Sequence, residues 1–131
     1  MFPSQAVPEK IKGSEDGNYM LMAEVIKELE LTAVAATGDM NVPVTGGYVS
    51  DLLSHVMGQA KAGQIWITMQ GHQNIVAVAS LVGMAAVIIA GGIEPEDQTV
   101  VKAAEQEVIL CKTTLSTYEV AGRLYQLGIV E

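Results

Sequence analysis

Two continuous apolar runs constrain the fold of this chain more than any other feature of its sequence. Residues 85–90 read AAVIIA and residues 108–111 read VILC, with no polar residue at alternate positions. Strands of this kind are covered on both faces, as in a parallel sheet between two layers of helices. Segments with helical periodicity separate the strand-like runs, which favours right-handed βαβ units. The sequence therefore predicts an α/β domain with a mostly parallel sheet and helices on both faces.

The expected elements alternate along residues 20–131. The 3.6-residue period and capping residues predict helices near residues 21–29, 51–60, 73–82 and 116–127, with a further helix opening at Pro95. Strands are expected at residues 32–36, 44–49, 64–68, 85–90 and 108–111. The loop between the first two strands is too short for a crossover helix, which leaves their pairing open.

The first 19 residues differ from the rest of the chain. Prolines and glycines at positions 3, 8, 13 and 17 break any periodicity, so we expect a flexible leader at residues 1–19 and one domain at residues 20–131. No basic segment precedes an apolar stretch in the manner of a secretory signal, and the single cysteine fits a reducing compartment. We therefore expect a cytoplasmic protein.

The charge of the chain argues against two classes of partner. The chain has fifteen acidic and seven basic residues, which gives a formal charge of −8, and the basic residues are scattered singly along the sequence. Binding of nucleic acid or of an anionic membrane surface requires clustered basic residues. The apolar run at residues 81–93 is also shorter than the roughly 20 residues that span a bilayer. We expect neither nucleic acid nor membrane as a partner.

Polar residues and glycines at the ends of the expected strands define a candidate ligand site. Segments 68–74, 90–92 and 112–116 should converge at the carboxyl edge of the sheet, and their hydroxyls, amides and helix N-terminal N–H groups suit a small anion. The Thr-Gly-Gly turn at residues 45–47 should lie beside the loop at residues 70–74. The predicted ligand-binding residues are Thr45, Gly46, Gly47, Asp51, Thr68, Gln70, His72, Gln73, Asn74, Gly91 and Gly92.

A plainer interpretation exists for the same residues. Gln73, Asn74, Ser116 and Thr117 are common types of helix-capping residue, and Gly91-Gly92 could serve only to turn the chain.

The sequence lacks a recognisable catalytic or cofactor motif. His72 has no Asp or Glu spaced to orient it, His55 is isolated, and Cys111 ends an apolar strand as a small core residue would. Neither a phosphate-binding loop nor a dinucleotide fingerprint occurs. We therefore predict no catalytic residue, no metal and no cofactor. The alternative is a small enzyme that uses His72 or Cys111 together with the Thr45-Gly46-Gly47 turn.

The helix expected at residues 73–82 carries no charge on any face. A helix that is apolar all round must be covered all round, and a single sheet covers only one side. The mean hydropathy of +0.32 is also high for a domain of this size. We therefore predict a homodimer in which this helix lies in or beside the interface.

From about residue 20 to residue 131 the chain resembles the DRTGG domain, particularly short stand-alone proteins described as related to HPr kinase. The matching runs are VTGGYVSDLLSHVM, IWITMQGHQNIVAVASL, IIAGGIEP and TTLSTYEVAGRLYQLGI. The Asp-Arg of the family name is replaced by Pro43-Val44, so a ligand role of that Arg does not carry over. The resemblance implies an accessory, regulatory or dimerising module, without the separate kinase domain. Relatives of this short form are often encoded near subunits of iron-only hydrogenases, so the resemblance also implies a redox setting.

Together these observations predict a non-enzymatic regulatory or dimerisation module that senses a small anionic or nucleotide-like ligand at the carboxyl edge. A protein-interaction subunit that acts on an enzyme of a redox system, of the hydrogenase type, is the main alternative.

Overall fold

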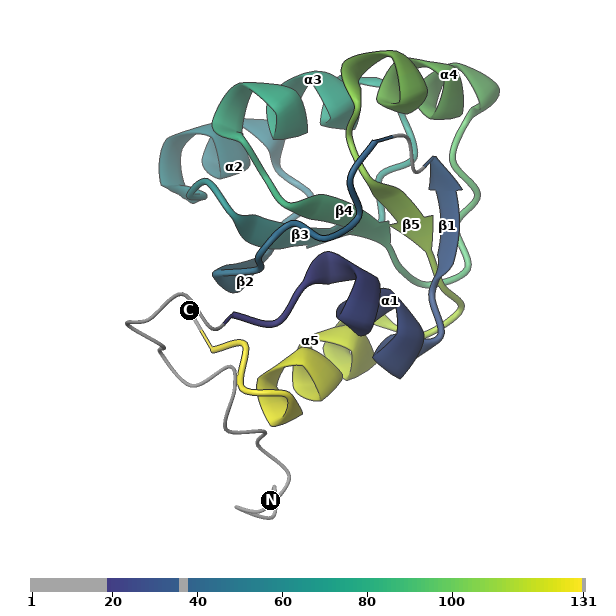
Figure 1. Cartoon of the computed structure of the whole chain (residues 1–131). Helices are drawn as coiled ribbons and strands as arrows, with labels where there is room; N and C mark the ends of the chain where they lie inside the picture. The colour runs from purple at the N-terminus through teal and green to yellow at the C-terminus, as the bar shows by residue number, and fades with distance from the viewer. Residues whose placement is uncertain (1–18, 36–37, 131) are drawn as a thin grey trace.

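The computed structural model describes residues 19–35 and 38–130, so the expected leader lies outside the described residues except for Tyr19. This part of the chain forms five helices and five strands in a single α/β domain (Figure 1). In chain order they are α1 (Met22–Leu29), β1 (Thr32–Ala35), β2 (Gly46–Val49), α2 (Leu53–Gln59), β3 (Gln64–Thr68), α3 (Asn74–Val82), β4 (Ala86–Ile89), α4 (Asp97–Gln106), β5 (Leu110–Lys112) and α5 (Thr117–Gln126).

The sheet has the strand order β1-β5-β4-β3-β2. Strands β2 to β5 are parallel to one another, and β1 runs antiparallel to β5 with Thr32 opposite Lys112. The pairing that the sequence left open is thereby decided, because β1 and β2 lie at opposite edges and do not pair. The prediction of a mostly parallel sheet is confirmed.

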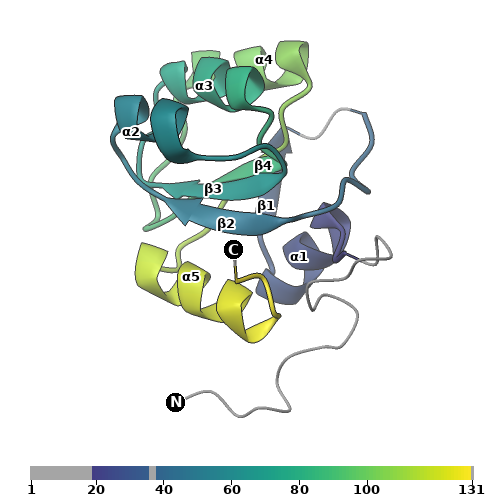
Figure 2. The same cartoon turned by 90° about the vertical axis from the view of Figure 1, so that its left-hand side faces the viewer.

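Helices cover both faces of this sheet (Figures 1 and 2). The chain moves in one direction across the sheet from β2 to β5, and right-handed crossovers place α2, α3 and α4 on the same face. Helix α5 follows β5 to the other face, where it packs beside α1. Neighbouring strands β4 and β5 are therefore followed by helices on opposite faces.

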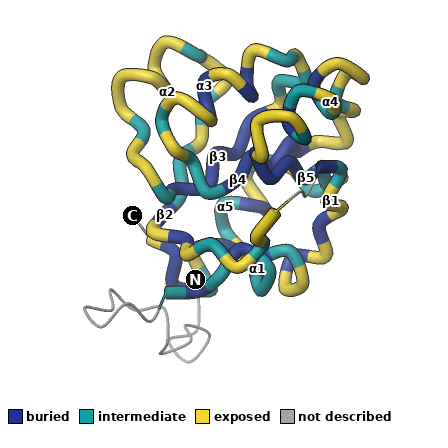
Figure 3. Tube along the Cα trace, turned by 45° about the horizontal axis from the view of Figure 1, so that its top comes forward, coloured by how far each residue is buried: buried dark blue, intermediate teal, exposed yellow. Residues whose placement is uncertain are grey.

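Two apolar clusters fill the spaces between the sheet and its helices. The strands β3, β4 and β5 are accordingly among the most buried parts of the chain (Figure 3). Along β3, Ile65 and Ile67 belong to the cluster beneath α1 and α5, whereas Trp66 belongs to the cluster beneath α2, α3 and α4. Successive residues of β4 alternate between the two clusters in the same way. This alternation explains why β4 is apolar at every position.

Helix α3 is covered more completely than its sequence suggested. Ile75, Val76, Val78 and Ala79 are buried, and α3 packs against both α2 and α4 as well as β4. Leu81 is the large apolar residue of α3 that stays exposed, at 75%. Val76 and Ala79 therefore belong to the core of the chain itself, because neighbouring helices supply most of the cover that we expected from a second subunit.

Candidate ligand-binding site at the carboxyl edge

The segment after β2 and the segment after β3 are joined through Asp51. Its Oδ1 atom accepts hydrogen bonds from Thr68 Oγ1 at 2.7 Å and from the Met69 backbone N–H at 2.8 Å. The Gln70 side chain donates from Nε2 to the Asp51 carbonyl at 2.6 Å. The structure thus brings Asp51, Thr68 and Gln70 together as predicted. Their hydrogen bonds connect the segment after β2 to the segment after β3.

His72, Gln73 and Asn74 lie at the start of α3. The Nδ1 atom of His72, the residue before the N-cap, accepts the backbone N–H of Asn74 at 3.1 Å, so the imidazole satisfies one of the free N–H groups at the start of this helix. Gln73 occupies the N-cap position and forms no side-chain capping bond. At the start of α5, Ser116 Oγ accepts the Glu119 backbone N–H at 3.1 Å, which fits the capping interpretation for Ser116.

The loop after β3 is also bound tightly to the loop after β4. Thr99 Oγ1 and the Glu96 backbone N–H both donate to the Gly71 carbonyl, at 2.6 Å and 3.0 Å. A Cβ atom at Gly71 would lie 2.9 Å from the Glu94 carbonyl oxygen, so only glycine allows this approach. The carboxyl edge is therefore one connected set of loops.

A crevice opens between the loops that follow β4 and β5. In parallel α/β sheets, ligands bind where the segments after adjacent strands turn to opposite faces, and α4 and α5 do so here. A hollow of about 190 Å³ lies at this place, bordered by residues 92–94 on one side and residues 112–114 on the other. Glu30 and Thr32, at the start of β1, complete its wall.

Gly91 and Gly92 shape this crevice through their backbone. Both residues have φ of 75°, a conformation that side chains disfavour. Their N–H groups donate to the Leu115 carbonyl at 2.7 Å and to the Thr113 carbonyl at 2.9 Å. Across the crevice, Lys112 Nζ lies 2.8 Å and 3.0 Å from the two carboxylate oxygens of Glu94.

The polar residues Glu94, Glu30 and Thr32 of the crevice were not predicted from the sequence. Glu94 lies in the turn before Pro95 and has no regular spacing to the other polar residues. Glu30 and Thr32 reach the crevice only because β1 pairs antiparallel with β5, which their own segment does not indicate. Lys112 carried a signal, since it directly follows the apolar strand run.

The Thr-Gly-Gly turn does not lie where the sequence predicted. Gly46 and Gly47 begin β2, opposite Gln64 and Ile65 of β3, and Thr45 donates its backbone N–H to the Gly63 carbonyl at 2.9 Å. The expectation that residues 45–47 approach residues 70–74 is wrong, because parallel neighbours start at the same end of a sheet. The length of β3, about 16 Å, separates residues 45–47 from residues 70–74.

Cys111 lies inside the core on β5, next to both β4 and β1. Burial raises the pKa of its thiol to about 12. The thiol is therefore protonated at neutral pH, whereas a nucleophilic cysteine reacts as the thiolate. The combination of Cys111 or His72 with the Thr45-Gly46-Gly47 turn does not form.

Within residues 19–35 and 38–130, no group of three His, Cys, Asp or Glu side chains is placed to hold a metal ion. None of the helices described for this chain is long and apolar enough to cross a membrane.

Comparison with known proteins identifies the family. No curated protein matches the chain. Among solved structures, it is similar to the CBS and DRTGG domains of the regulatory region of Clostridium perfringens pyrophosphatase, complexed with the activator diadenosine tetraphosphate. The TM-score is 0.65 at 15% identity, and the match covers 96% of this chain but only 51% of that one, so the likeness shows a shared fold. The family model of the DRTGG domain matches residues 32–127. This chain therefore belongs to the DRTGG domain family.

Proposed function

We propose that this protein is a non-enzymatic regulatory module that binds a small anionic or nucleotide-like ligand at the carboxyl edge of its sheet. The observation that carries the proposal is the fold shared with a regulatory region that was solved with a nucleotide activator. Membership of the DRTGG family over residues 32–127 supports the same role.

The chemistry of the carboxyl edge supports binding rather than turnover. His72 Nδ1 caps a helix, Asp51 Oδ1 holds the loop after β3, and the Cys111 thiol is buried and protonated. General base catalysis needs a group whose acceptor atom is available to the substrate. The crevice between the loops after β4 and β5 instead provides a small concave surface with one ion pair and several hydroxyl groups.

We expect a ligand of this module to raise its melting temperature without being consumed. A compound present at 100 times its Kd stabilises the folded state by about 2.7 kcal/mol, which raises Tm by about 10 °C for a chain of this size. Differential scanning fluorimetry with nucleotides, acyl phosphates and amino acids measures this shift, with sodium chloride of equal ionic strength as the control. If no compound stabilises the protein saturably, the sensing function is wrong.

We further propose that the protein is a homodimer in which the exposed part of α3 contributes to the contact. Leu81→Glu should then convert dimers to monomers with unchanged helicity, because a carboxylate placed against a partner loses its hydration. Light scattering gives the mass and far-ultraviolet circular dichroism checks the fold. Lys102→Glu on α4 is the control and should leave the mass unchanged. A Leu81→Glu dimer would show that the contact lies elsewhere.

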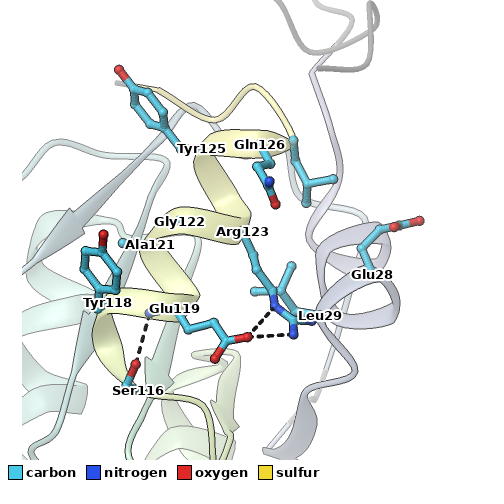
Figure 4. Close-up of a pocket in the computed structure, with 11 residues that line it drawn as sticks. Glu28, Leu29, Ser116, Tyr118, Glu119, Ala121, Gly122, Arg123, Tyr125 and Gln126 are labelled. Carbon is cyan, nitrogen blue, oxygen red and sulfur yellow. Dashed lines mark hydrogen bonds and ion pairs between the residues drawn. The ribbon is translucent and has the colours of Figure 1, made fainter. Parts of the chain in front are cut away.

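A second function, as the interaction subunit of a larger redox enzyme, is favoured by the surface of α1 and α5. A broad groove of about 1020 Å³ lies there, lined by residues of both helices (Figure 4). Tyr118 and Tyr125, seven positions apart on one side of α5, are 89% and 52% exposed. Tyrosine is enriched at protein interfaces. Co-purification of the tagged chain from its native host, with hydrogenase subunits in the eluate, would support this function.

A further inference from the structure

The size of the crevice between residues 92–94 and residues 112–114 limits what it can hold. Its volume of about 190 Å³ is below the roughly 300–1,000 Å³ of pockets that enclose drug-sized ligands. A whole dinucleotide does not fit inside. A molecule with a few heavy atoms does.

The charges that line the crevice limit the ligand further. Lys112 is the one basic residue among the described lining residues, and the carboxylates of Glu30 and Glu94 outnumber it. Lys112 also pairs with Glu94, and the two side chains are 30% and 72% exposed. A simple anion that bound Lys112 would leave the Glu94 carboxylate unpaired and close to a like charge, which is unfavourable.

The backbone N–H groups of the Gly-Gly turn do not make up for this shortage of positive charge. Phosphate-binding turns present several free N–H groups to the anion. Here the N–H groups of Gly91 and Gly92 already donate to the Leu115 and Thr113 carbonyls. The Thr113 N–H donates to the Ile89 carbonyl at 3.0 Å, and the Leu115 N–H donates to Thr113 Oγ1 at 3.1 Å. The N–H groups of the Gly-Gly turn are thus already bonded to the loop after β5 and are not available to an anion.

A ligand that carries both charges meets each of these conditions. Its anionic group can take the place of Glu94 beside Lys112, and its cationic group can take the place of Lys112 beside Glu94. Glu94 is the more exposed partner of the resident ion pair, so it can turn into solvent and release Lys112 at little cost. The hydroxyl groups of Thr32, Thr113 and Thr114 line the same space and can bond to either group.

We propose that this crevice binds a small zwitterion of the α-amino-acid type, with its carboxylate on Lys112 and its ammonium group on Glu94. The inference rests on the proposed sensing function and names the ligand class of that site. At this crevice it replaces the expected anionic ligand by one whose ammonium group balances the charge of its carboxylate.

Titration of the ¹⁵N-labelled full chain with the standard amino acids tests this proposal. We expect at least one of them to shift the amide signals of Gly92, Glu94, Lys112 and Thr113 in a saturable way. The amine that lacks its carboxylate and the acid that lacks its amino group should each bind at least about tenfold more weakly, since each loses a charge-assisted contact. Lys112→Met and Glu94→Gln should each weaken binding by a similar factor.

The chain offers a matched control in the exposed ion pair of α5. Arg123 and Glu119 are 2.8 Å apart, so Arg123→Met and Glu119→Gln remove a similar pair outside the crevice and should leave binding unchanged. Equal binding of the acid without its amino group, or tighter binding by Glu94→Gln, would overturn the proposal in favour of an anion site. It is also overturned if no amino acid shifts the crevice amides. In that case, nucleotides or acyl phosphates that shift the signals of Thr68, Gln70 and His72 would still support the sensing function. If no compound shifts any amide signal, both the amino-acid site and the sensing function are wrong.

Discussion

Trp66→Ala should lower the free energy of unfolding by about 4 kcal/mol, which corresponds to a fall in Tm of about 15 °C. Trp66 is fully buried in β3 and packs in the cluster beneath α2, α3 and α4. Its indole Nε1–H also donates to the Ser50 carbonyl at 2.8 Å. The substitution therefore leaves a large cavity and releases the segment that carries Asp51.

Urea denaturation followed by far-ultraviolet circular dichroism measures this effect, because Trp66 is the single tryptophan of the chain and its fluorescence disappears with it. Trp66→Phe keeps most of the apolar volume and should cost about 2 kcal/mol, mainly through the lost hydrogen bond. Tyr118→Ala at an exposed position should change stability by less than about 0.5 kcal/mol. A Trp66→Ala protein with the urea midpoint of the wild type would contradict the buried position of Trp66 between the sheet and its helices.

Gly71→Ala should destabilise the fold by about 2 kcal/mol through overpacking at the carboxyl edge. The new Cβ atom would lie 2.9 Å from the Glu94 carbonyl oxygen and 3.3 Å from the Pro95 Cα atom. Both are backbone atoms, so no side chain can move aside to make room. The loops must separate, which weakens the hydrogen bond from the buried Thr99 hydroxyl to the Gly71 carbonyl.

Gly58→Ala is the matched control for this substitution. Gly58 lies within α2, and a Cβ atom there would meet no heavy atom of another element within 4 Å. Alanine at this position should therefore stabilise the helix by about 0.5–1 kcal/mol. Thermal unfolding followed by circular dichroism compares the two variants. If Gly71→Ala has the same Tm as the wild type, the loops after β3 and β4 do not contact each other as described.

The local sequence predicted the elements well where one physical signal dominated. The apolar runs at β4 and β5 indicated strands buried on both faces, and the structure places both inside the sheet, with a neighbouring strand on each side. Helix α3 was also predicted within one residue of its start. The elements that pack on α3 were not predicted. A helix without charges can be covered by other helices of the same chain or by a second subunit, and the two cases have the same sequence pattern.

The candidate site was predicted only in part, for a related reason. Asp51, Thr68 and Gln70 meet because each lies at or just after the carboxyl end of a strand, and the two strands, β2 and β3, are parallel neighbours. Residues 45–47 precede the main part of their strand, so the same rule places them at the other end. Treating the first residues of a strand as a turn at its far end thus places a candidate residue at the wrong edge of the sheet.

Composition and local periodicity were sufficient to predict the α/β class, and the motif runs were sufficient to indicate the family. Which residues share the crevice depends instead on how the whole chain packs. Glu30 and Thr32 reach Lys112 only through the antiparallel pairing of β1 with β5, and Glu94 reaches it because α4 and α5 leave adjacent strands toward opposite faces. Strand order and crossover direction are global properties of the packed chain, and no short segment encodes them.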